Sequence, residues 1–325
     1  MNLLNVKNLK TSFFTKQGEV QAVRGVDFEV YQGEVLGIVG ESGSGKSVTS
    51  KSIMQILGDT GKIKDGEILF KGEDLLKKSN RELMKIRGKE IAMVFQDPMT
   101  SLNPVYTVGK QMTDVIRKHS KMNKKEARAK AIEILKSVGV PSPEQRIQGY
   151  PHEFSGGMRQ RVMIAMALSC EPDLLIADEP TTALDVTIQA QILELMKNLK
   201  KEKETSIMLI THDLGVVAEV CDRIAVMYGG LIMECGKAKD IFENPNHPYT
   251  IGLMQSMPKI DQNDRLIPID GMPPDLCDPP MGCPFANRCM DRLEICESKM
   301  PPSAEIQKGH RSNCWLNEKG RDIIE

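Results

Sequence analysis

Short apolar runs separated by polar turns dominate the first hundred residues. Alternating apolar and polar positions predict two strands, Leu3 to Leu9 and Val20 to Val30, on either side of a turn at 15–18. Continuous apolar runs predict buried strands at 35–39 and 91–95, and a further strand is expected at 66–70. The N-terminal part is therefore predicted to be rich in sheet.

Between residues 106 and 170 the pattern changes to apolar positions at helical spacing. Strand character returns at 173–178 and 206–211, on either side of a helix expected at 186–199. Two short strands at 224–227 and 231–234 flank Gly229-Gly230, which predicts a hairpin. The alternation of strands and helices predicts an α/β fold with a mainly parallel sheet and an inserted helical subdomain at about 97–170.

The segment Gly40–Ser47 fits the phosphate-binding pattern G-x-x-x-x-G-K-[ST] without a mismatch. A predicted strand precedes it, and a helical pattern from Lys46 to Leu57 follows it. A glycine-rich turn at a helix N-terminus directs backbone N–H groups at an anion. We expect Lys46 to reach the β- and γ-phosphates and the Ser47 hydroxyl to bind Mg²⁺. The loop residues expected around the phosphates are Ser42, Gly43, Ser44 and Gly45.

Polar side chains follow several of the predicted strands. Asp178 ends one apolar strand and suits a metal-holding role, directly or through water. Glu179, the next residue, can orient or deprotonate a water that attacks the γ-phosphate. Gln96 lies where Pro98 stops another strand, and His212 follows the strand at 206–211. Ligands of open α/β sheets bind at the carboxyl ends of the strands. Glu179, Gln96 and His212 are therefore candidate catalytic residues.

Two weaker signals complete the candidate nucleotide site. Ser155 is a plausible N-cap for a helix running to about Ser169, and Gly156 and Gly157 would expose backbone N–H groups at its positive end. Alone, such a Ser-Gly-Gly segment is usually an ordinary loop. Phe13, or its neighbour Phe14, either stacks on an adenine ring or caps the sheet, and spacing does not decide between the two.

Composition restricts the class of protein. The 325 residues contain 43 Lys plus Arg and 44 Asp plus Glu, so the near-zero net charge gives no support for a general nucleic-acid binder. No apolar run approaches the roughly 18 residues of a membrane span, and the N-terminus lacks an export signal. A soluble, cytoplasmic chain is expected.

Taken together, six motifs carry a resemblance to a known family. Gly40–Ser47, Gln96, Ser155–Gln160, Leu174–Glu179, Ala183–Asp185 and His212 occur in the order typical of an ABC-type ATPase nucleotide-binding domain. The sequences of segments 94–104, 151–161 and 181–187 resemble those of the ATP-binding subunits of oligopeptide, dipeptide and nickel ABC importers. The signature is Phe-Ser-Gly-Gly-Met where the general form is Leu-Ser-Gly-Gly-Gln, a variant frequent in that branch.

The resemblance implies a P-loop NTPase fold at 1–258, with a RecA-like core, an antiparallel β subdomain and a helical subdomain. It also implies that ATP is held between two such domains, with Ser155, Gly156 and Gly157 of one facing the phosphate loop of the other. Glu179 would be the catalytic base and His212 would contact the γ-phosphate. Gln96 would link Mg²⁺ and the water to the helical subdomain. Asp185, in the motif that follows Glu179, would be a nucleotide-binding residue.

The same resemblance implies the partners. These are a second, different ATP-binding subunit in a heterodimer, two transmembrane permease subunits and, indirectly, an extracytoplasmic peptide-binding protein. The chain would work at the cytoplasmic face of the membrane, hydrolysing ATP to drive uptake of di- and oligopeptides. Alternatives are import of nickel or another small solute, and a soluble ABC ATPase acting on nucleic acid or ribosomes. A module that binds nucleotide without turnover is disfavoured by Glu179 and His212.

Residues 259–325 are rich in proline and cysteine, and a loop-rich extension is expected there. Disulfides are disfavoured in a cytoplasmic chain, and structural zinc usually shows a closer pair of cysteines. Four or more thiolates also allow an iron–sulfur cluster, although not with ferredoxin spacing. The resemblance favours a [4Fe–4S] cluster ligated by Cys283, Cys289, Cys296 and Cys314. Cys277 is additional to that pattern.

Overall fold

The computed structural model describes residues 2–97, 101–181, 186–256 and 268–318. The chain divides into two compact units. The first comprises residues 1–3, 30–35 and 77–210, and the second comprises residues 4–29, 36–76 and 211–325. The phosphate loop lies in the second unit, whereas Gln96, Asp178 and Glu179 lie in the first.

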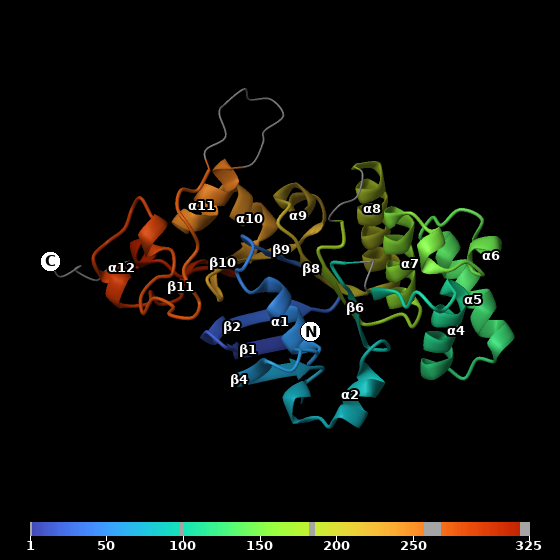
Figure 1. Cartoon of the computed structure of the whole chain (residues 1–325). Coiled ribbons are helices and arrows are strands. Elements are labelled where there is room, and N and C mark those ends of the chain that lie inside the picture. Colours follow the sequence, from blue (N-terminus) through green and yellow to red (C-terminus); the bar gives the residue numbers. More distant parts are fainter. Residues whose placement is uncertain (1, 98–100, 182–185, 257–267, 319–325) are drawn as a thin grey trace. The chain divides into compact units, whose positions relative to one another are not determined.

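The N-terminal sheet of the second unit has the strand order β2-β1-β4-β5. Its strands are β1 (Asn2–Thr15), β2 (Gly18–Tyr31), β4 (Gly61–Phe70) and β5 (Glu73–Asp74). They appear in blue in Figure 1, and β1 pairs antiparallel with β4. The predicted N-terminal strands are confirmed, but each is longer than its apolar alternation, because backbone pairing continues past the last buried side chain.

A second set of strands in this unit joins distant parts of the chain. β3 (Val35–Val39) runs parallel to β9 (Arg223–Tyr228), and β9 forms the expected hairpin with β10 (Leu231–Lys237). β10 then pairs with β12 (His310–Ser312), which pairs with β11 (Ala304–Gln307). The expectation of a loop-rich C-terminal segment was therefore incomplete, because this segment adds two short strands to a sheet. It also contains η3 (Ala286–Arg288), α12 (Ile295–Ser298) and η4 (Trp315–Asn317).

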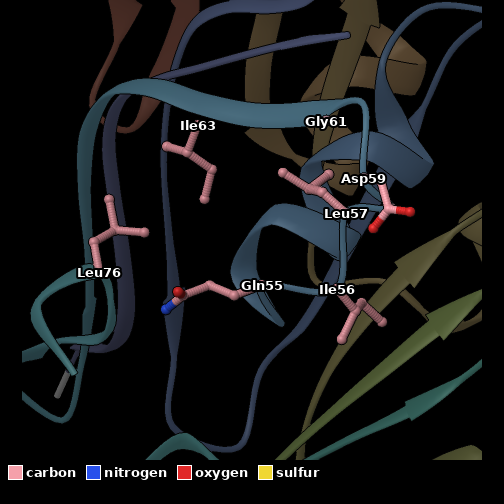
Figure 2. A pocket seen from close by; sticks show the side chains of 8 residues that line it. Gln55, Ile56, Leu57, Asp59, Gly61, Ile63 and Leu76 are labelled. Carbon is pink, nitrogen blue, oxygen red and sulfur yellow. The ribbon is translucent and has the colours of Figure 1, made fainter. Parts of the chain in front are cut away.

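The helix after the phosphate loop is shorter than its pattern predicts. The helix α1 (Lys46–Ile53) ends before Gln55, whose φ of 48° is incompatible with a continuing right-handed helix. Ile56 and Leu57, whose spacing predicts that they share one helix face with Ile53, instead line an open hollow of about 670 Å³ (Figure 2). The remaining helices of this unit are η1 (Leu75–Lys77), α9 (Leu214–Val220), α10 (Ala238–Glu243) and α11 (Pro248–Gln255).

The first unit contains three neighbouring parallel strands, β6 (Ile91–Val94), β7 (Leu174–Asp178) and β8 (Ser206–Ile210). Every residue of β7 and β8 is buried, which agrees with the four consecutive apolar residues that each strand contains. α8 (Val186–Lys203) connects β7 to β8, as expected for a parallel crossover.

The helical block of the first unit confirms the predicted helical insert. It contains α4 (Val108–His119), α5 (Lys124–Ser137), α6 (Pro143–Arg146), η2 (Pro151–Glu153) and α7 (Gly156–Leu168), drawn in green to yellow-green in Figure 1. Thr107 caps α4, and Asn123 forms a capping box with Glu126 at the start of α5. A similar box of Ser79 and Glu82 begins α2 (Asn80–Ile86). The predicted α/β fold with a helical subdomain is thus confirmed.

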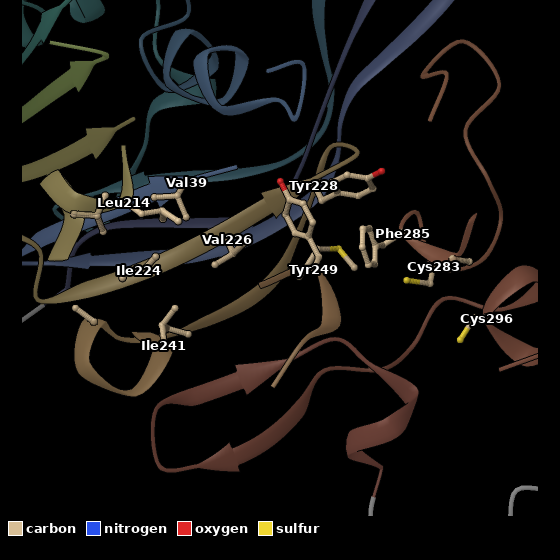
Figure 3. Packing of buried hydrophobic residues seen from close by; sticks show 14 residues of the cluster. Val39, Leu214, Ile224, Val226, Tyr228, Ile241, Tyr249, Cys283, Phe285 and Cys296 are labelled. Carbon is tan, nitrogen blue, oxygen red and sulfur yellow. The ribbon is translucent and has the colours of Figure 1, made fainter. Parts of the chain in front are cut away.

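The cysteine-rich segment shares a hydrophobic core with the strands near the phosphate loop. Cys283, Phe285 and Cys296 are buried in one cluster with residues of β9 and α11, including Tyr228 and Tyr249 (Figure 3). The predicted boundary between residues 258 and 259 falls among residues 257–267, which lie outside the described part of the chain. That boundary stays a prediction.

Candidate nucleotide-binding site

Steric crowding explains why glycines are needed at both ends of the phosphate loop. A Cβ atom at Gly40 would lie 2.1 Å from the carbonyl oxygen of Met227, and one at Gly45 would lie 2.5 Å from that of Ala22. Both glycines also have positive φ, 149° and 102°. The loop is thus closed against β9 and β2 so tightly that no side chain fits at either position.

The loop lysine is buried and held by the loop itself. Nζ of Lys46 donates to the carbonyl oxygens of Gly40 at 2.7 Å and Glu41 at 2.8 Å, and to Oγ of Ser44 at 3.3 Å. Only 5% of Lys46 is exposed. This geometry keeps the cationic group at the start of α1, where backbone N–H groups also favour an anion. Ser42 and Gly43 are exposed, and Ser47 is half-buried.

The C-terminal part of the second unit braces this loop. The backbone N–H of Glu41 donates to the hydroxyl of Tyr249 at 2.9 Å, and the carboxylate of Glu41 pairs with Arg288. Burial raises the pKa of Tyr249 above its ordinary value, so this hydroxyl is neutral at physiological pH. Neither contact was anticipated, because the partners are separated by more than 200 residues and no spacing rule connects them.

The first unit brings two of the predicted catalytic side chains together. Nε2 of Gln96 donates to Oε2 of Glu179 at 2.8 Å, although 83 residues separate them. Glu179 has a φ of 47°, in the left-handed region that costs a non-glycine residue on the order of 1–3 kcal/mol. Its backbone N–H donates to the carbonyl oxygen of Ile210 at 2.8 Å. This bond holds the backbone in the left-handed conformation directly after β7.

Asp178 has the burial and chemistry of a metal-holding carboxylate. It ends β7 with 2% of its surface exposed. Mg²⁺ prefers carboxylate, hydroxyl and amide oxygens as ligands. The predicted Mg²⁺ ligands Ser47, Gln96 and Asp178 each carry one of these oxygen donors. ATP and Mg²⁺ are the ligands that the sequence motifs predict for this site.

His212 lies in the second unit, two residues after the end of β8 in the sequence, and is exposed. Its neighbours are fixed. The backbone N–H of Thr211 donates to the carbonyl oxygen of Ile38 at 3.3 Å, and Asp213 caps α9 by accepting from the N–H groups of Gly215 and Val216. The backbone on both sides of His212 is therefore held in place.

The signature segment, Phe154 to Gly157, forms a helix start as predicted. Ser155 is the N-cap of α7, and its Oγ accepts from the N–H of Met158 at 3.3 Å. Ser155 and Gly156 are exposed, and a Cβ atom at Gly156 would meet nothing within 4 Å. Gln160, one turn further, is 1% exposed and donates to the carbonyl oxygen of Pro180 at 2.7 Å. The signature helix is thus tied to the segment that follows Glu179.

Two predicted ligand residues remain untested. Phe13 is half-buried on β1, where it pairs with Gly61 of β4, and the choice between adenine stacking and a sheet cap stays open. Asp185 lies outside the described residues.

The four predicted cluster ligands lie in one part of the fold. Cys283, Cys296 and Cys314 are buried, Cys289 is half-buried, and the N–H of Cys283 donates to the carbonyl oxygen of Cys296 at 2.8 Å. Burial raises the pKa of Cys283 to about 12 and that of Cys314 to about 11, with smaller contributions from neighbouring cysteines. Among the described residues, no group of three or more His, Cys, Asp or Glu side chains is arranged to hold a metal ion. The expected [4Fe–4S] cluster therefore gains no support from the structure.

Comparison with known proteins agrees with this geometry. Residues 23–182 match the family model of the ABC transporter, and residues 233–296 match that of the oligopeptide/dipeptide transporter C-terminal region. The dipeptide transport ATP-binding protein DppD of Bacillus subtilis (strain 168) is 57% identical over 98% of this chain and 95% of its own length. The oligopeptide transport ATP-binding protein OppD of the same organism is also 57% identical, over 97% of this chain and 88% of its own length.

The fold has solved relatives as well. A bacterial ABC transporter cassette, solved as a dimer and also in a post-hydrolysis state bound to ADP and Pi, has a TM-score of 0.66 and 29% identity. The match covers 72% of this chain and 98% of that cassette. In the described part of the present chain, no helix has the length and apolar character needed to span a bilayer. The chain belongs to the ABC transporter family and is one of its ATP-binding cassette ATPases.

Proposed function

We propose that the chain hydrolyses ATP to drive uptake of di- and oligopeptides through a separate membrane permease. The observation that carries this proposal is identity along almost the whole chain to peptide-transport ATP-binding proteins, with a second family match at 233–296 beyond the cassette. A general ABC ATPase requires only the first match. The C-terminal match is what favours peptide transport over other substrates.

In this proposal the polar residues at the strand ends each have a separate role in ATP hydrolysis. Glu179 accepts a proton from the attacking water, and Gln96 holds the carboxylate of Glu179 in position through its 2.8 Å hydrogen bond. Lys46 binds the β- and γ-phosphates, His212 contacts the γ-phosphate, and Phe13 stacks on the adenine. Ser47, Gln96 and Asp178 would hold Mg²⁺, which neutralises phosphate charge when bound.

We further propose that the complete pocket forms between two chains. Ser155 caps a 13-residue helix that begins at Gly156 and Gly157, and Ser155 and Gly156 are exposed, so the N–H groups at this helix start could meet the phosphates of ATP bound on a partner. Asp185, which lies outside the described residues, is proposed as a further nucleotide-binding residue. The partner is proposed to be a second, different ATP-binding subunit, as the resemblance to peptide importers implies. ATP binding then closes the pair, and hydrolysis opens it.

The remaining partners follow from the same proposal. Two permease subunits carry the peptide across the membrane, and an extracytoplasmic peptide-binding protein delivers it. The ATPase is then a peripheral protein at the cytoplasmic face of the membrane. Nucleic acid is not an expected partner, since the net charge is −1.

Transport by the assembled complex tests the proposal. The chain is purified with its permease and second ATPase subunit, placed in vesicles, and supplied with labelled dipeptide, labelled oligopeptide or Ni²⁺. Peptide uptake that requires ATP and is lost with Glu179→Gln is expected. A complex that takes up Ni²⁺ but neither peptide would contradict the proposal. Peptide uptake that persists with Glu179→Gln would contradict it as well. Glu194→Gln, on an exposed position of α8, is the matched control.

We also propose that Cys283, Cys289, Cys296 and Cys314 bind a [4Fe–4S] cluster. The resemblance to peptide importers and the proximity of four thiols support this, whereas the donor arrangement among the described residues does not. Anaerobic purification followed by visible absorption and iron analysis is the test. Iron that is lost in Cys283→Ser but kept in Cys277→Ser, an exposed cysteine outside the set, is expected. One zinc without iron would overturn the proposal.

A further inference from the structure

The phosphate loop contains an acidic side chain in a place built to bind anions. Glu41 follows Gly40, and its carbonyl oxygen accepts from Nζ of Lys46 at 2.8 Å, so its backbone belongs to the phosphate cradle itself. Its side chain is 26% exposed. A negative charge at this position opposes the binding of a polyphosphate, because like charges repel strongly where solvent is partly excluded. The loop therefore requires a compensating charge.

Arg288, carried on η3 of the cysteine-rich segment, supplies that charge. Nη1 donates to Oε2 of Glu41 at 2.7 Å, and Nη2 donates to Oε1 at 3.1 Å. This is a two-point pair between a guanidinium and a carboxylate, which fixes orientation as well as charge. Only 6% of the Arg288 side chain is exposed, so water screens the pair weakly.

The other donors of Arg288 are also occupied. Nη1 donates to the hydroxyl of Tyr228 at 3.1 Å, Nη2 to the carbonyl oxygen of Ile269 at 2.9 Å, and Nε to that of Asp270 at 2.8 Å. Together with the two bonds to Glu41, these make five hydrogen bonds, which is the number of N–H donors in a guanidinium. Such a group has one preferred position, and it holds Glu41 there.

Aromatic rings support the same arrangement. The guanidinium carbon of Arg288 lies 5.7 Å from the ring centre of Tyr228 and 5.9 Å from that of Phe285. The ring of Tyr249, whose hydroxyl accepts from the N–H of Glu41, lies 4.5 Å from that of Tyr228 and 5.3 Å from that of Phe285. Figure 3 shows these three rings together beside Cys283. The loop and the cysteine-rich segment thus contact the same group of packed aromatic rings.

We propose that Arg288 is a positioning residue of the ATP site, and that the cysteine-rich segment sets the affinity of the phosphate loop for nucleotide by neutralising Glu41. This inference rests on ATP binding at Gly40–Ser47. It assigns to the C-terminal segment a role in the ATPase itself. The effect grows with the charge of the ligand, so ATP depends on Arg288 more than ADP does, and ADP more than AMP.

Direct titration of the full chain with MgATP, ADP and AMP tests the proposal. Arg288→Gln is expected to weaken ATP binding about 10-fold, with a smaller effect on ADP and the smallest on AMP. Adding Glu41→Gln to that variant removes the unpaired carboxylate, so affinity for ATP recovers to within about 3-fold of the original chain. Arg292→Gln is the matched control, because Arg292 pairs with Glu297 at 3.0 Å on the exposed surface of the same segment. Its affinity is expected to match that of the original chain.

Glu41→Gln alone separates this role from a purely structural one. If charge decides, this variant binds ATP at least as tightly as the original chain. If the ion pair only holds the fold, it binds more weakly, and the double variant does not recover; either result overturns the proposal. Should Arg288→Gln not fold, as judged by its thermal melt, Glu41→Gln decides alone. An original chain that does not bind MgATP would instead contradict the ATP site itself.

Discussion

The phosphate loop and the signature segment are both glycine-containing turns that lead into a helix, but they differ in how the chain supports them. Around the phosphate loop, Gly40 and Gly45 are pressed against backbone, and Lys46, Tyr249 and Arg288 hold the turn from inside and outside. At the signature segment, Ser155 and Gly156 are exposed and open space surrounds Gly156. The phosphate loop is held by contacts within the chain, whereas the start of the signature segment is exposed, as a surface that binds another molecule must be.

The largest expected effect tests the chemical step that both segments serve. Glu179→Gln keeps the shape of the side chain and removes the proton acceptor, so ATP hydrolysis should fall about 100-fold or more while ATP remains bound. Phosphate release and nucleotide retention measure the two effects separately. The exposed Glu194→Gln in α8 should hydrolyse ATP at the original rate. Hydrolysis unchanged in Glu179→Gln would show that another group is the base.

A pair of glycine substitutions tests the contrast directly. Gly40→Ala forces a Cβ atom to within 2.1 Å of a carbonyl oxygen at a φ of 149°, so it should lower the free energy of unfolding by about 2–5 kcal/mol. Gly156→Ala meets open space in the first turn of α7 and should leave that free energy unchanged or raise it by up to about 1 kcal/mol. Chemical denaturation of the isolated chain measures both.

The second half of that test is activity. If the signature segment contacts ATP on a partner, Gly156→Ala should slow hydrolysis by the assembled complex about 10- to 100-fold, because a misplaced contact disturbs the reacting geometry. A variant that is fully stable and yet poorly active would sharpen the contrast between the two segments. Full activity in Gly156→Ala would remove the signature segment from the proposed interface.

Local patterns were sufficient for the phosphate loop, the buried strands and most helices, since each depends on the side chains within one short segment. Local patterns failed where a single backbone angle determines the end of a helix. The apolar spacing of Ile56 and Leu57 predicts a continuing helix, but the positive φ of Gln55 ends it. They also missed the strands β11 and β12, which are short, partly charged and joined through the turn at Lys308–Gly309.

Contacts between distant segments were the other limit. The bond from Gln96 to Glu179 and the pair of Arg288 with Glu41 join positions 83 and 247 residues apart. Sequence spacing identified Gln96 and Glu179 as separate candidates because each follows a predicted strand. Nothing in the spacing of Arg288 relative to the cysteines indicates that it contacts the phosphate loop, so its role depends on the folded structure.

The smallest expected effect concerns the support behind the phosphate loop. His247 is 1% exposed and caps α11, with Nδ1 accepting from the N–H of Tyr249 at 3.0 Å. Burial lowers the pKa of His247 from 6.5 to about 3. The folded state thus holds this imidazole neutral, while the unfolded state takes up a proton below about pH 6.5. The stabilising contribution is complete above pH 6.5 and is lost as the pH falls toward 3, with a slope of at most about 1.4 kcal/mol per pH unit.

His247→Asn tests this contribution, because an asparagine oxygen can still cap α11 but does not titrate. Denaturation between pH 5 and pH 8 should show a weaker loss of stability on acidification in the variant than in the original chain, and little difference in slope above pH 7. The same titration of ATP affinity in both chains connects the result to the phosphate loop, since Tyr249 holds Glu41. If the free energy of unfolding falls with the same slope in both chains below pH 6.5, His247 is protonated in the folded chain. That result would contradict a neutral His247 cap on α11.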